Sequence, residues 1–135
     1  MDNEDLRRAG LKITQPRMII LEILNNSEQH HFSAEEVYRK LCDAGEDVGL
    51  ATVYRVLTQF EKAGLVKRLN FEGGHSVFEL DQGKHHDHLV CVKCGRVDEF
   101  VDPQIEQRQG EIAKKSGFVM TDHSLNIYGM CAACQ

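Results

Sequence analysis

Two pairs of cysteines are the residues of this sequence whose spacing most directly indicates chemistry. Cys91 and Cys94 form one CxxC motif, and Cys131 and Cys134 form another. Two such pairs can close a tetrahedron of thiolates around zinc, with each sulfur about 2.3 Å from the metal. Because four thiolates leave no coordination position open, we expect a structural zinc rather than a catalytic one. The alternatives are a thiol redox pair or unligated cysteines.

The fifth cysteine, Cys42, stands outside both motifs. An odd number of cysteines does not fit a closed set of disulfides, which also favours a metal site in a reducing compartment. We expect Cys42 to pack as a small apolar side chain near the end of a helix and to take no part in chemistry.

A histidine-rich run, His85-His86-Asp87-His88, offers ligands of a second kind. In an extended segment the side chains alternate, which sends His86 and His88 to one face and His85 and Asp87 to the other. The run could therefore serve two different metal sites, although a solvated run in a linker is the alternative. Imidazole and carboxylate suit Fe²⁺, Zn²⁺, Mn²⁺ and Co²⁺ about equally well. The remaining nitrogen and oxygen ligands that could complete such sites are His30, His31, Glu79, Glu99, Glu106 and His123.

A third feature, a basic segment around Tyr54 and Arg55, has the residue types that contact DNA. From Leu50 to Leu69 there are four basic residues and one acid, a local net charge of +3 on a chain whose net charge is −5. In a helix that enters the major groove, Tyr54 can touch thymine methyl groups and Arg55 can reach guanine or phosphate. A solvated helix face is the alternative interpretation.

The elements that must position these residues begin with three helices and a two-stranded hairpin, the order of a winged helix-turn-helix. Pro16 suits the first turn of the first helix, and Ser33 opens the second with a capping box. Residues 50–63 form the third helix, and residues 65–69 and 76–80 form the two strands of the wing.

The second half of the chain is expected to be a small α/β unit that follows a hinge at 81–84. Asp102 caps its helix, which ends at Gly117, and the apolar stripe of that helix is thin. A unit of about 50 residues with so small a core usually needs a metal, a partner subunit or both. Its strands are expected at residues 88–92, 96–101 and 119–128.

Length and composition exclude several classes of protein. A chain of 135 residues that is 41% hydrophobic and 27% charged is an ordinary globular protein with one compact domain or two very small ones. No stretch approaches the roughly 18 apolar residues of a membrane helix. The acidic start, Met1 to Asp5, is unlike a secretory signal, so we expect a cytoplasmic protein. Because the net charge is negative, any DNA binding must rest on a local patch.

Two other functional classes, an enzyme and a metal-storage protein, would use some of the same residues. His86 and His88 have the HxH spacing found in some metallohydrolases, where an open metal site activates water. No further Asp-His pair follows, and no GxSxG nucleophile motif occurs, so we do not expect an enzyme. A metal-storage protein or metal chaperone would explain the ligands but not the wing or the Tyr54-Arg55 pair.

Taken together, these motifs resemble the ferric uptake regulator family over nearly the whole chain. The resemblance implies an α+β protein with an N-terminal winged-helix domain over residues 1–80 and a C-terminal α/β dimerisation domain over residues 85–135. It implies a metal-activated transcriptional repressor that forms a homodimer or a higher assembly. The segments that carry it are Ala9 to Lys12, Pro16-Arg17, Gly49 to Leu57, Phe78 to Leu80, the histidine run with Cys91 and Cys94, and His123 to Leu125.

The resemblance also implies two metal sites besides the zinc at the four cysteines. The ligands that it assigns to the two sites divide the histidine run by its two faces, and they leave His30 as a surface residue. The regulatory site would take ligands from both domains, namely His31, Glu79, His86, His88 and Glu99. A second site within the dimerisation domain would use His85, Asp87, Glu106 and His123.

Glutamate at positions 79 and 99, where peroxide sensors of the family tend to carry aspartate, favours Fe²⁺ as the regulatory metal. Mn²⁺, Zn²⁺ or Co²⁺ can replace iron at such ligands, and a zinc- or manganese-responsive regulator of the same family is the alternative. The expected partner is AT-rich, palindromic double-stranded DNA at iron uptake genes. By the same resemblance, Tyr54 and Arg55 would read the major groove and Lys12 would reach the minor groove, with Arg17 and Thr52 completing the DNA contacts.

Overall fold

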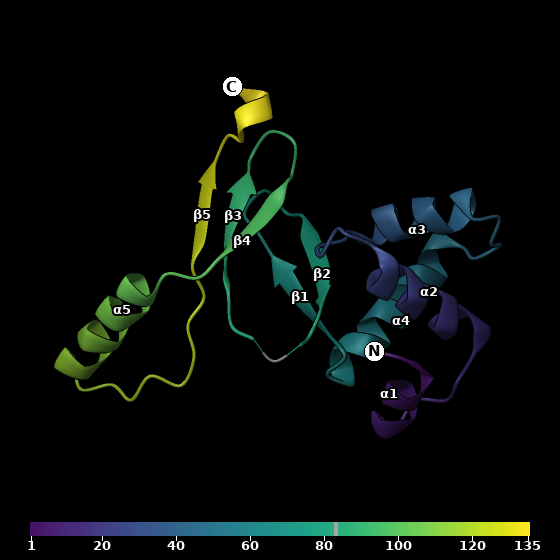
Figure 1. Ribbon diagram of the computed structural model, residues 1–135, viewed down its shortest axis with the longest axis horizontal. Helices are drawn as coiled ribbons and strands as arrows, with labels where there is room; N and C mark the ends of the chain where they lie inside the picture. The colour runs from purple at the N-terminus through teal and green to yellow at the C-terminus, as the bar shows by residue number, and fades with distance from the viewer. Residues whose placement is uncertain (83) are drawn as a thin grey trace. The chain divides into compact units, whose positions relative to one another are not determined.

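The computed structural model describes residues 1–82 and 84–135 and divides the chain into two units, Met1–Gly83 and Lys84–Gln135 (Figure 1). Gly83, part of the expected hinge 81–84, lies outside the described residues. Both units combine helices with strands, so the expected α+β class is confirmed.

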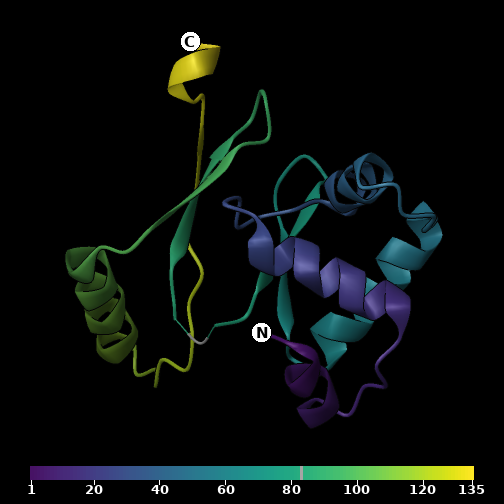
Figure 2. The same cartoon turned by 45° about the vertical axis from the view of Figure 1, so that its right-hand side comes forward.

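The first unit contains four helices followed by an antiparallel hairpin. In two views of the molecule the hairpin lies along one side of the helices (Figures 1 and 2). Its strands pair in a register that sets Val66 opposite Leu80 and Asn70 opposite Ser76. The order expected for a winged helix-turn-helix is therefore confirmed, with one additional helix at the start. The elements are α1 (Asn3–Arg8), α2 (Gln15–Asn26), α3 (Ala34–Asp43), α4 (Leu50–Lys62), β1 (Val66–Asn70) and β2 (Ser76–Leu80).

The short helix α1 was not expected from the sequence. The Asp2 carboxylate accepts hydrogen bonds from the backbone N–H groups of Glu4 and Asp5, and the Asp5 carboxylate accepts one from the Asp2 N–H. Leu6 is its one buried side chain. A single apolar residue in six carries no helical period, so the acidic capping box was the only available signal.

The ends of the longer helices follow the sequence signals. The Ser33 hydroxyl accepts from the Glu36 N–H at 3.1 Å, while the Glu36 carboxylate accepts from the Ser33 N–H, which confirms the capping box. Pro16 lies in the first turn of α2 after a cap at Thr14. The helix α4 ends before Gly64, whose φ of +81° only glycine adopts readily.

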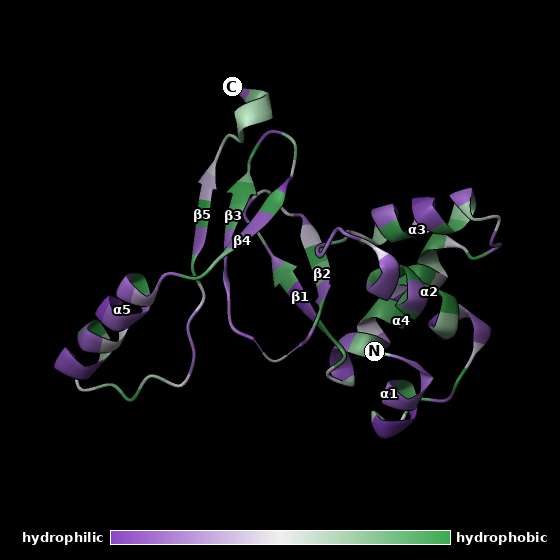
Figure 3. Cartoon of the chain, viewed as in Figure 1, coloured by the Kyte–Doolittle hydropathy of each residue, from purple (hydrophilic) through white to green (hydrophobic). Residues whose placement is uncertain are grey.

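A single apolar core holds α4 in place. The apolar faces of α2, α3 and α4 meet there, as the green stretches of these helices in Figure 3 indicate. This packing leaves the opposite face of α4, with Tyr54 and Arg55, exposed. The buried side chains of the three helices are Ile20, Leu21, Leu24, Ala34, Val37, Leu41, Val53, Val56, Leu57 and Phe60.

The packing expected for Cys42 is wrong, because its side chain is exposed. The helical period of α3 turns Val37 and Leu41 into the core, and the next residue faces outward. The Tyr38 hydroxyl contacts the Cys42 thiol, and this hydrogen bond raises the pKa of Tyr38 above its ordinary value.

The second unit is a three-stranded sheet with a separate helix. The central strand β3 (Asp87–Cys91) pairs antiparallel with β4 (Val97–Phe100) and parallel with β5 (Asn126–Gly129). The helix α5 (Pro103–Lys115) begins after the expected cap, where the Asp102 carboxylate accepts from the Gln104 N–H at 2.9 Å. It stands apart from the sheet in both views (Figures 1 and 2). A short 3₁₀ helix η1 (Ala132–Cys134) follows.

The strand expected over residues 119–128 is much shorter than its sequence pattern indicates. Only Asn126–Gly129 forms a strand, where it pairs with four residues of β3, His88 to Cys91. Residues 118–125 instead connect the end of α5 to the sheet. Phe118 and Val119 are exposed by 72% and 90% in this connection.

The small core expected for the second unit is confirmed by the burial of its side chains. Within residues 84–135, only Val90 and Cys91 are buried hydrophobic residues, and α5 buries none. Many large apolar side chains of this unit stay exposed, including Leu89, Val92, Val101, Ile112, Ile127 and Met130. Apolar burial within one chain therefore does little to hold this unit together. In the described part of the chain, no helix is both long and apolar enough to cross a membrane.

Candidate metal centres and DNA-binding helix

The four cysteines of the two CxxC motifs come together at one end of the sheet. Cys91 ends β3, Cys94 lies in the turn before β4, Cys131 directly precedes η1, and Cys134 is its last residue. Their sulfur atoms all lie within 4.8 Å of one another, and those of Cys94 and Cys131 are 3.7 Å apart. A tetrahedral site with zinc–sulfur bonds of about 2.3 Å requires sulfurs about 3.8 Å apart. The cluster therefore fits one zinc ion.

The backbone around Cys91 favours its thiolate. Its sulfur accepts hydrogen bonds from the N–H groups of Cys131 at 3.4 Å and Cys94 at 3.5 Å. These bonds lower the pKa of Cys91 to about 5. A hydrogen bond to Cys131 is the main reason that the pKa of Cys134 is raised to about 12, and burial of its thiol is the second. A divalent cation would stabilise the thiolate form of all four cysteines, so its binding releases protons from the cluster.

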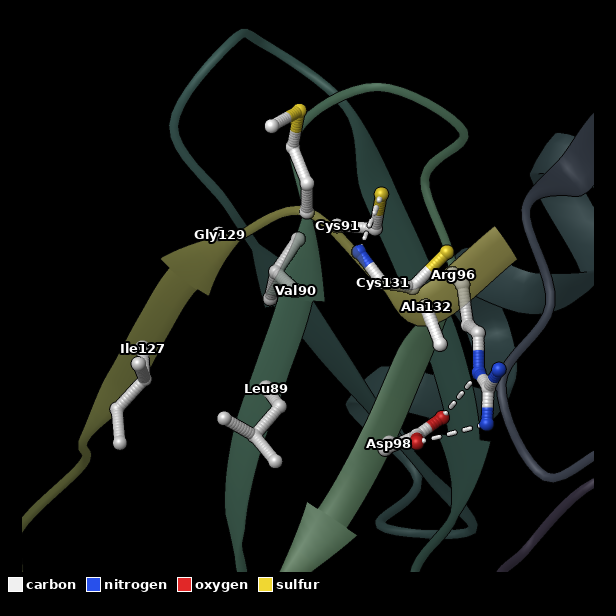
Figure 4. Close-up of a pocket in the computed structure, with 10 residues that line it drawn as sticks. Leu89, Val90, Cys91, Arg96, Asp98, Ile127, Gly129, Cys131 and Ala132 are labelled. Atoms are coloured by element: carbon white, nitrogen blue, oxygen red, sulfur yellow. Dashed lines mark hydrogen bonds and ion pairs between the residues drawn. The ribbon is translucent and has the colours of Figure 1, made fainter. Parts of the chain in front are cut away.

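Beside this cluster, the sheet carries a pocket of about 320 Å³ (Figure 4). Arg96 and Asp98 form a bidentate ion pair at one side of it, with nitrogen–oxygen distances of 2.8 and 3.0 Å. The pocket is also lined by apolar side chains that belong to the exposed apolar surface of the unit, namely Leu89, Ile127 and Met130. This face of the sheet is therefore suited to contact with another protein surface.

A second cluster joins β3 to α5 and to the connection that follows α5. The imidazole Nε2 of His85 lies 3.3 Å from Asp87 Oδ1 and 3.7 Å from Glu106 Oε1. The Nε2 of His123 lies 3.8 Å from the same Asp87 oxygen. Possible ligand atoms of all four residues lie within 4.8 Å of one another.

Asp87 is the buried centre of this second cluster. Its side chain is 1% exposed, and its two carboxylate oxygens accept no hydrogen bond within the described part of the chain. A buried carboxylate without hydrogen bonds is unfavourable unless a positive charge compensates it. The residues present therefore fit a cation.

In the first unit, His31 and Glu79 form a buried pair. Phe32 and Phe78 exchange backbone hydrogen bonds of 3.0 and 2.7 Å, which joins the segment before α3 to β2. This bridge brings the neighbouring side chains together, with 2.9 Å between His31 Nε2 and Glu79 Oε2. His30, beside this pair in sequence, is exposed as expected.

In the second unit, His86, His88 and Glu99 form a matching group. The β3–β4 register places His88 opposite Glu99. The rings of His86 and His88 have centroids 4.8 Å apart, and His86 Nε2 lies 3.5 Å from Glu99 Oε1. Each unit thus brings together its own share of the ligands expected for the regulatory site. Their role as ligands stays a prediction.

The helix α4 presents its expected DNA-reading residues outward. Arg55 is exposed, Tyr54 is 42% exposed, and Thr52 is half-buried in the first turn. The Tyr54 hydroxyl donates a hydrogen bond of 2.6 Å to the Glu35 carboxylate on α3. Sequence patterns gave no sign of this contact, because the two residues lie on different helices.

The guanidinium group of Arg17 is hydrogen-bonded within the protein. It donates to the Lys12 carbonyl at 2.8 Å and to the Gln59 side-chain oxygen at 3.1 and 3.3 Å. The half-buried Arg17 thereby connects the segment that carries Lys12 to α4, while the Lys12 side chain is exposed. Its assignment as a direct DNA contact stays a prediction.

Arg68, counted in the basic patch, is also engaged within the protein. It donates to Thr58 at 2.9 Å, pairs with Glu61 at 3.3 Å and lies over the Phe78 ring at 4.9 Å. Arg55, Lys62 and Lys67 remain exposed for a polyanionic partner.

Comparison with known proteins agrees with this geometry. Residues 8–128 match the model of the ferric uptake regulator family. The chain is 69% identical to the ferric uptake regulation protein of Legionella pneumophila, over 99% of this chain and 98% of that protein. The chain belongs to the ferric uptake regulator family.

Two solved structures of ferric uptake regulators share the fold of this family member. The Vibrio cholerae regulator is 60% identical and superimposes with a TM-score of 0.90, covering 96% of this chain and 98% of that one. The Francisella tularensis regulator, solved with iron, is 46% identical with a TM-score of 0.88, covering 93% and 95% of the two chains.

Membership of the ferric uptake regulator family establishes the general function. This family member is a metal-responsive, DNA-binding transcriptional repressor of iron uptake that acts as a dimer. Structures of related regulators hold iron, manganese or zinc. The exposed apolar surface of the second unit is consistent with dimerisation.

Proposed function

We propose that Fe²⁺ is the regulatory metal of this family member and that the metal-loaded dimer binds AT-rich, palindromic operator DNA in the cytoplasm. The observation that carries the proposal is the pairing of nitrogen and oxygen ligands within each unit. His31 and Glu79 lie 2.9 Å apart in the first unit, and His86 and Glu99 lie 3.5 Å apart in the second. Such ligands suit Fe²⁺ and admit Mn²⁺, Zn²⁺ or Co²⁺ in its place.

These ligands would hold one regulatory cation jointly, with His88 as the fifth. A cation bound there supplies a link between the DNA-binding unit and the dimerisation unit. Ligands shared in this way restrict the angle between the units, and thereby the spacing of the two α4 helices in a dimer. If the restriction favours the DNA-binding angle ~100-fold, the coupling free energy is ~2.7 kcal/mol, within the usual range for allosteric proteins.

The other two clusters have structural roles in this proposal. The four cysteines bind a zinc ion that connects the last residues of the chain to β3. His85, Asp87, Glu106 and His123 hold a second cation that ties α5 to the sheet. The 1% exposure of the Asp87 side chain supports this assignment. None of the three sites is assigned a catalytic role, and we propose that the protein is not an enzyme.

The DNA contacts proposed for the first unit follow from the exposed face of α4. Tyr54 and Arg55 enter the major groove, with Thr52 at the start of the same helix, and Lys12 reaches the minor groove. Arg17 supports Lys12 through its bond to the Lys12 carbonyl at 2.8 Å. AT-rich DNA suits this arrangement, because its narrow minor groove attracts basic side chains and its thymine methyl groups offer apolar contacts.

A gel-shift experiment tests the proposed function. Zinc-loaded protein is mixed with an AT-rich palindromic duplex under anaerobic conditions, with and without Fe²⁺, and in parallel with Mn²⁺ or with additional Zn²⁺. We expect a shift that requires the metal, and none on a random duplex of equal length at the same protein concentration. Metal-independent binding would contradict the proposal, and a response to Zn²⁺ alone would favour the zinc-sensing alternative.

Substitution of Arg55 by alanine should weaken operator binding by about 1–3 kcal/mol if Arg55 contacts a base. Lys67→Ala, in the exposed part of β1, should weaken binding to all DNA about equally and lower the salt slope by about one. Fluorescence anisotropy with operator and random duplexes at several salt concentrations measures both effects. If Arg55→Ala binds the operator as tightly as the wild type does, α4 is not the recognition helix.

A further inference from the structure

The hydrogen bond between Tyr54 and Glu35 joins the exposed face of α4 to the first turn of α3. The hydroxyl of Tyr54 donates to Oε1 of Glu35 at 2.6 Å. The helices that carry them pack through the common core, so their backbones are held in position. The two side chains themselves are exposed. The contact is therefore made at the surface that we propose faces DNA.

The hydrogen bond determines where the Tyr54 ring points. An exposed tyrosine can otherwise rotate about its first side-chain torsion. A hydrogen bond to an ionised carboxylate is short and roughly twice as strong as one between neutral groups. The bond to Tyr54 lowers the pKa of Glu35 and raises the pKa of Tyr54. At neutral pH the carboxylate is thus charged and the phenol keeps its proton.

Glu35 also places a negative charge beside Tyr54, a residue that we propose enters the major groove between the two phosphate backbones. A carboxylate near a phosphate backbone weakens binding to every DNA sequence, because the repulsion does not depend on the bases. On the operator this repulsion is offset by the base contacts of the oriented tyrosine, whereas on other DNA it is not. An arrangement of this kind increases the difference between the two affinities.

We propose that Glu35 is a positioning residue that increases DNA specificity, by orienting the Tyr54 hydroxyl and by repelling DNA on which Tyr54 finds no base partner. The inference rests on the proposed function, since it requires Tyr54 to lie in the major groove. It assigns to α3 a part in recognition that the sequence motifs place on α4 alone.

The test compares two uncharged replacements of Glu35, glutamine and alanine. Both remove the charge and its interaction with the α3 dipole, but only glutamine keeps an oxygen that can accept the Tyr54 hydrogen bond. Each is made in the wild type and in Tyr54→Phe. Asp43→Asn, the same charge change at the far end of α3, serves as the control. Binding to operator and random duplexes is measured by anisotropy with saturating Mn²⁺, and melting curves confirm that each variant folds.

We expect Glu35→Ala to bind the operator about fivefold more weakly than Glu35→Gln, the effect of a typical hydrogen bond. The difference should disappear in the Tyr54→Phe background. Both variants should bind random DNA about twofold more tightly than the wild type. Asp43→Asn should not, because Asp43 lies about 12 Å from Glu35 along α3, which is more than a Debye length from the Tyr54 contact.

Two results would overturn the inference while leaving the proposed function intact. One is equal operator affinity of Glu35→Ala and Glu35→Gln, or a difference that persists without the Tyr54 hydroxyl. The other is a random-DNA affinity that neither substitution changes. Failure of the proposed function would look different, because the wild type with Mn²⁺ would then bind operator and random DNA equally. That result would overturn the inference as well, since Tyr54 would read no bases.

Discussion

Replacing Cys91 by serine is expected to release one zinc per chain and to unfold residues 84–135. The free energy of binding zinc at such a site is roughly 10–16 kcal/mol and is at the same time folding free energy. A typical domain is stable by only about 5–15 kcal/mol. The second unit buries only two hydrophobic side chains within its described residues, so it has little else to hold it. Zinc content and circular dichroism melting curves of the purified variant measure both effects.

Cys42→Ser is the matched control for this prediction. Cys42 is exposed on α3 and lies outside the cysteine cluster, so its replacement should leave zinc content and melting unchanged. Cys94→Ser should behave like Cys91→Ser, because its sulfur lies 3.7 Å from that of Cys131 within the same cluster. A Cys91→Ser protein with stoichiometric zinc and wild-type melting would rule out the structural zinc site.

Replacing His88 by alanine is expected to abolish the response of DNA binding to metal while leaving a folded, zinc-containing dimer. His88 lies with His86 and Glu99 in the group that we assign to the regulatory site. Its loss should remove most of a metal-induced gain in operator affinity of about 100-fold. His31→Ala, in the first unit, should have the same effect. Titration of operator binding with Mn²⁺ at constant zinc content measures the gain.

His85→Ala provides the contrasting variant for the same titration. His85 faces Asp87 at 3.3 Å and Glu106 at 3.7 Å, so its loss should loosen the dimerisation unit and weaken the metal response without abolishing it. His30→Ala, next to His31 but exposed, should respond as the wild type does. If His85→Ala abolishes the response and His88→Ala keeps it, the two sites are assigned the wrong way round. Equal behaviour of all the ligand variants would indicate one mixed cluster.

Features that depend on neighbouring residues could be predicted from the sequence. The capping box at Ser33, the helix stop at Gly64 and the cap at Asp102 each involve atoms a few residues apart, so the local sequence determines them. The same holds for the CxxC spacing and for the alternation that separates His86 from His85. Such signals, in order along the chain, were sufficient to predict the α+β class, the winged helix and the residue types of the three metal sites.

Other features depend on which segments meet in space. The strand β5 has only four residues, which pair with His88 to Cys91 of β3, although the sequence predicts a strand from Val119 onward. Cys42 is exposed because Leu41 occupies the core position of that turn. The first outcome depends on a pairing partner that is distant in sequence, about which local propensity carries no information. The second follows from the helical period of α3 once Val37 and Leu41 face the core.

The proposed DNA-binding face shows most clearly which features the local sequence predicts and which depend on tertiary packing. Composition and helical pattern place Tyr54 and Arg55 among the candidate DNA contacts, and the family resemblance adds Arg17. Tertiary structure decides that Arg17 binds Gln59, a residue 42 positions away, and that Tyr54 binds Glu35, a residue 19 positions away. The physical reason is that a hydrogen bond across helices depends on how the helices pack around their core. The sequence of either helix alone specifies which groups can bond but not which groups come within reach.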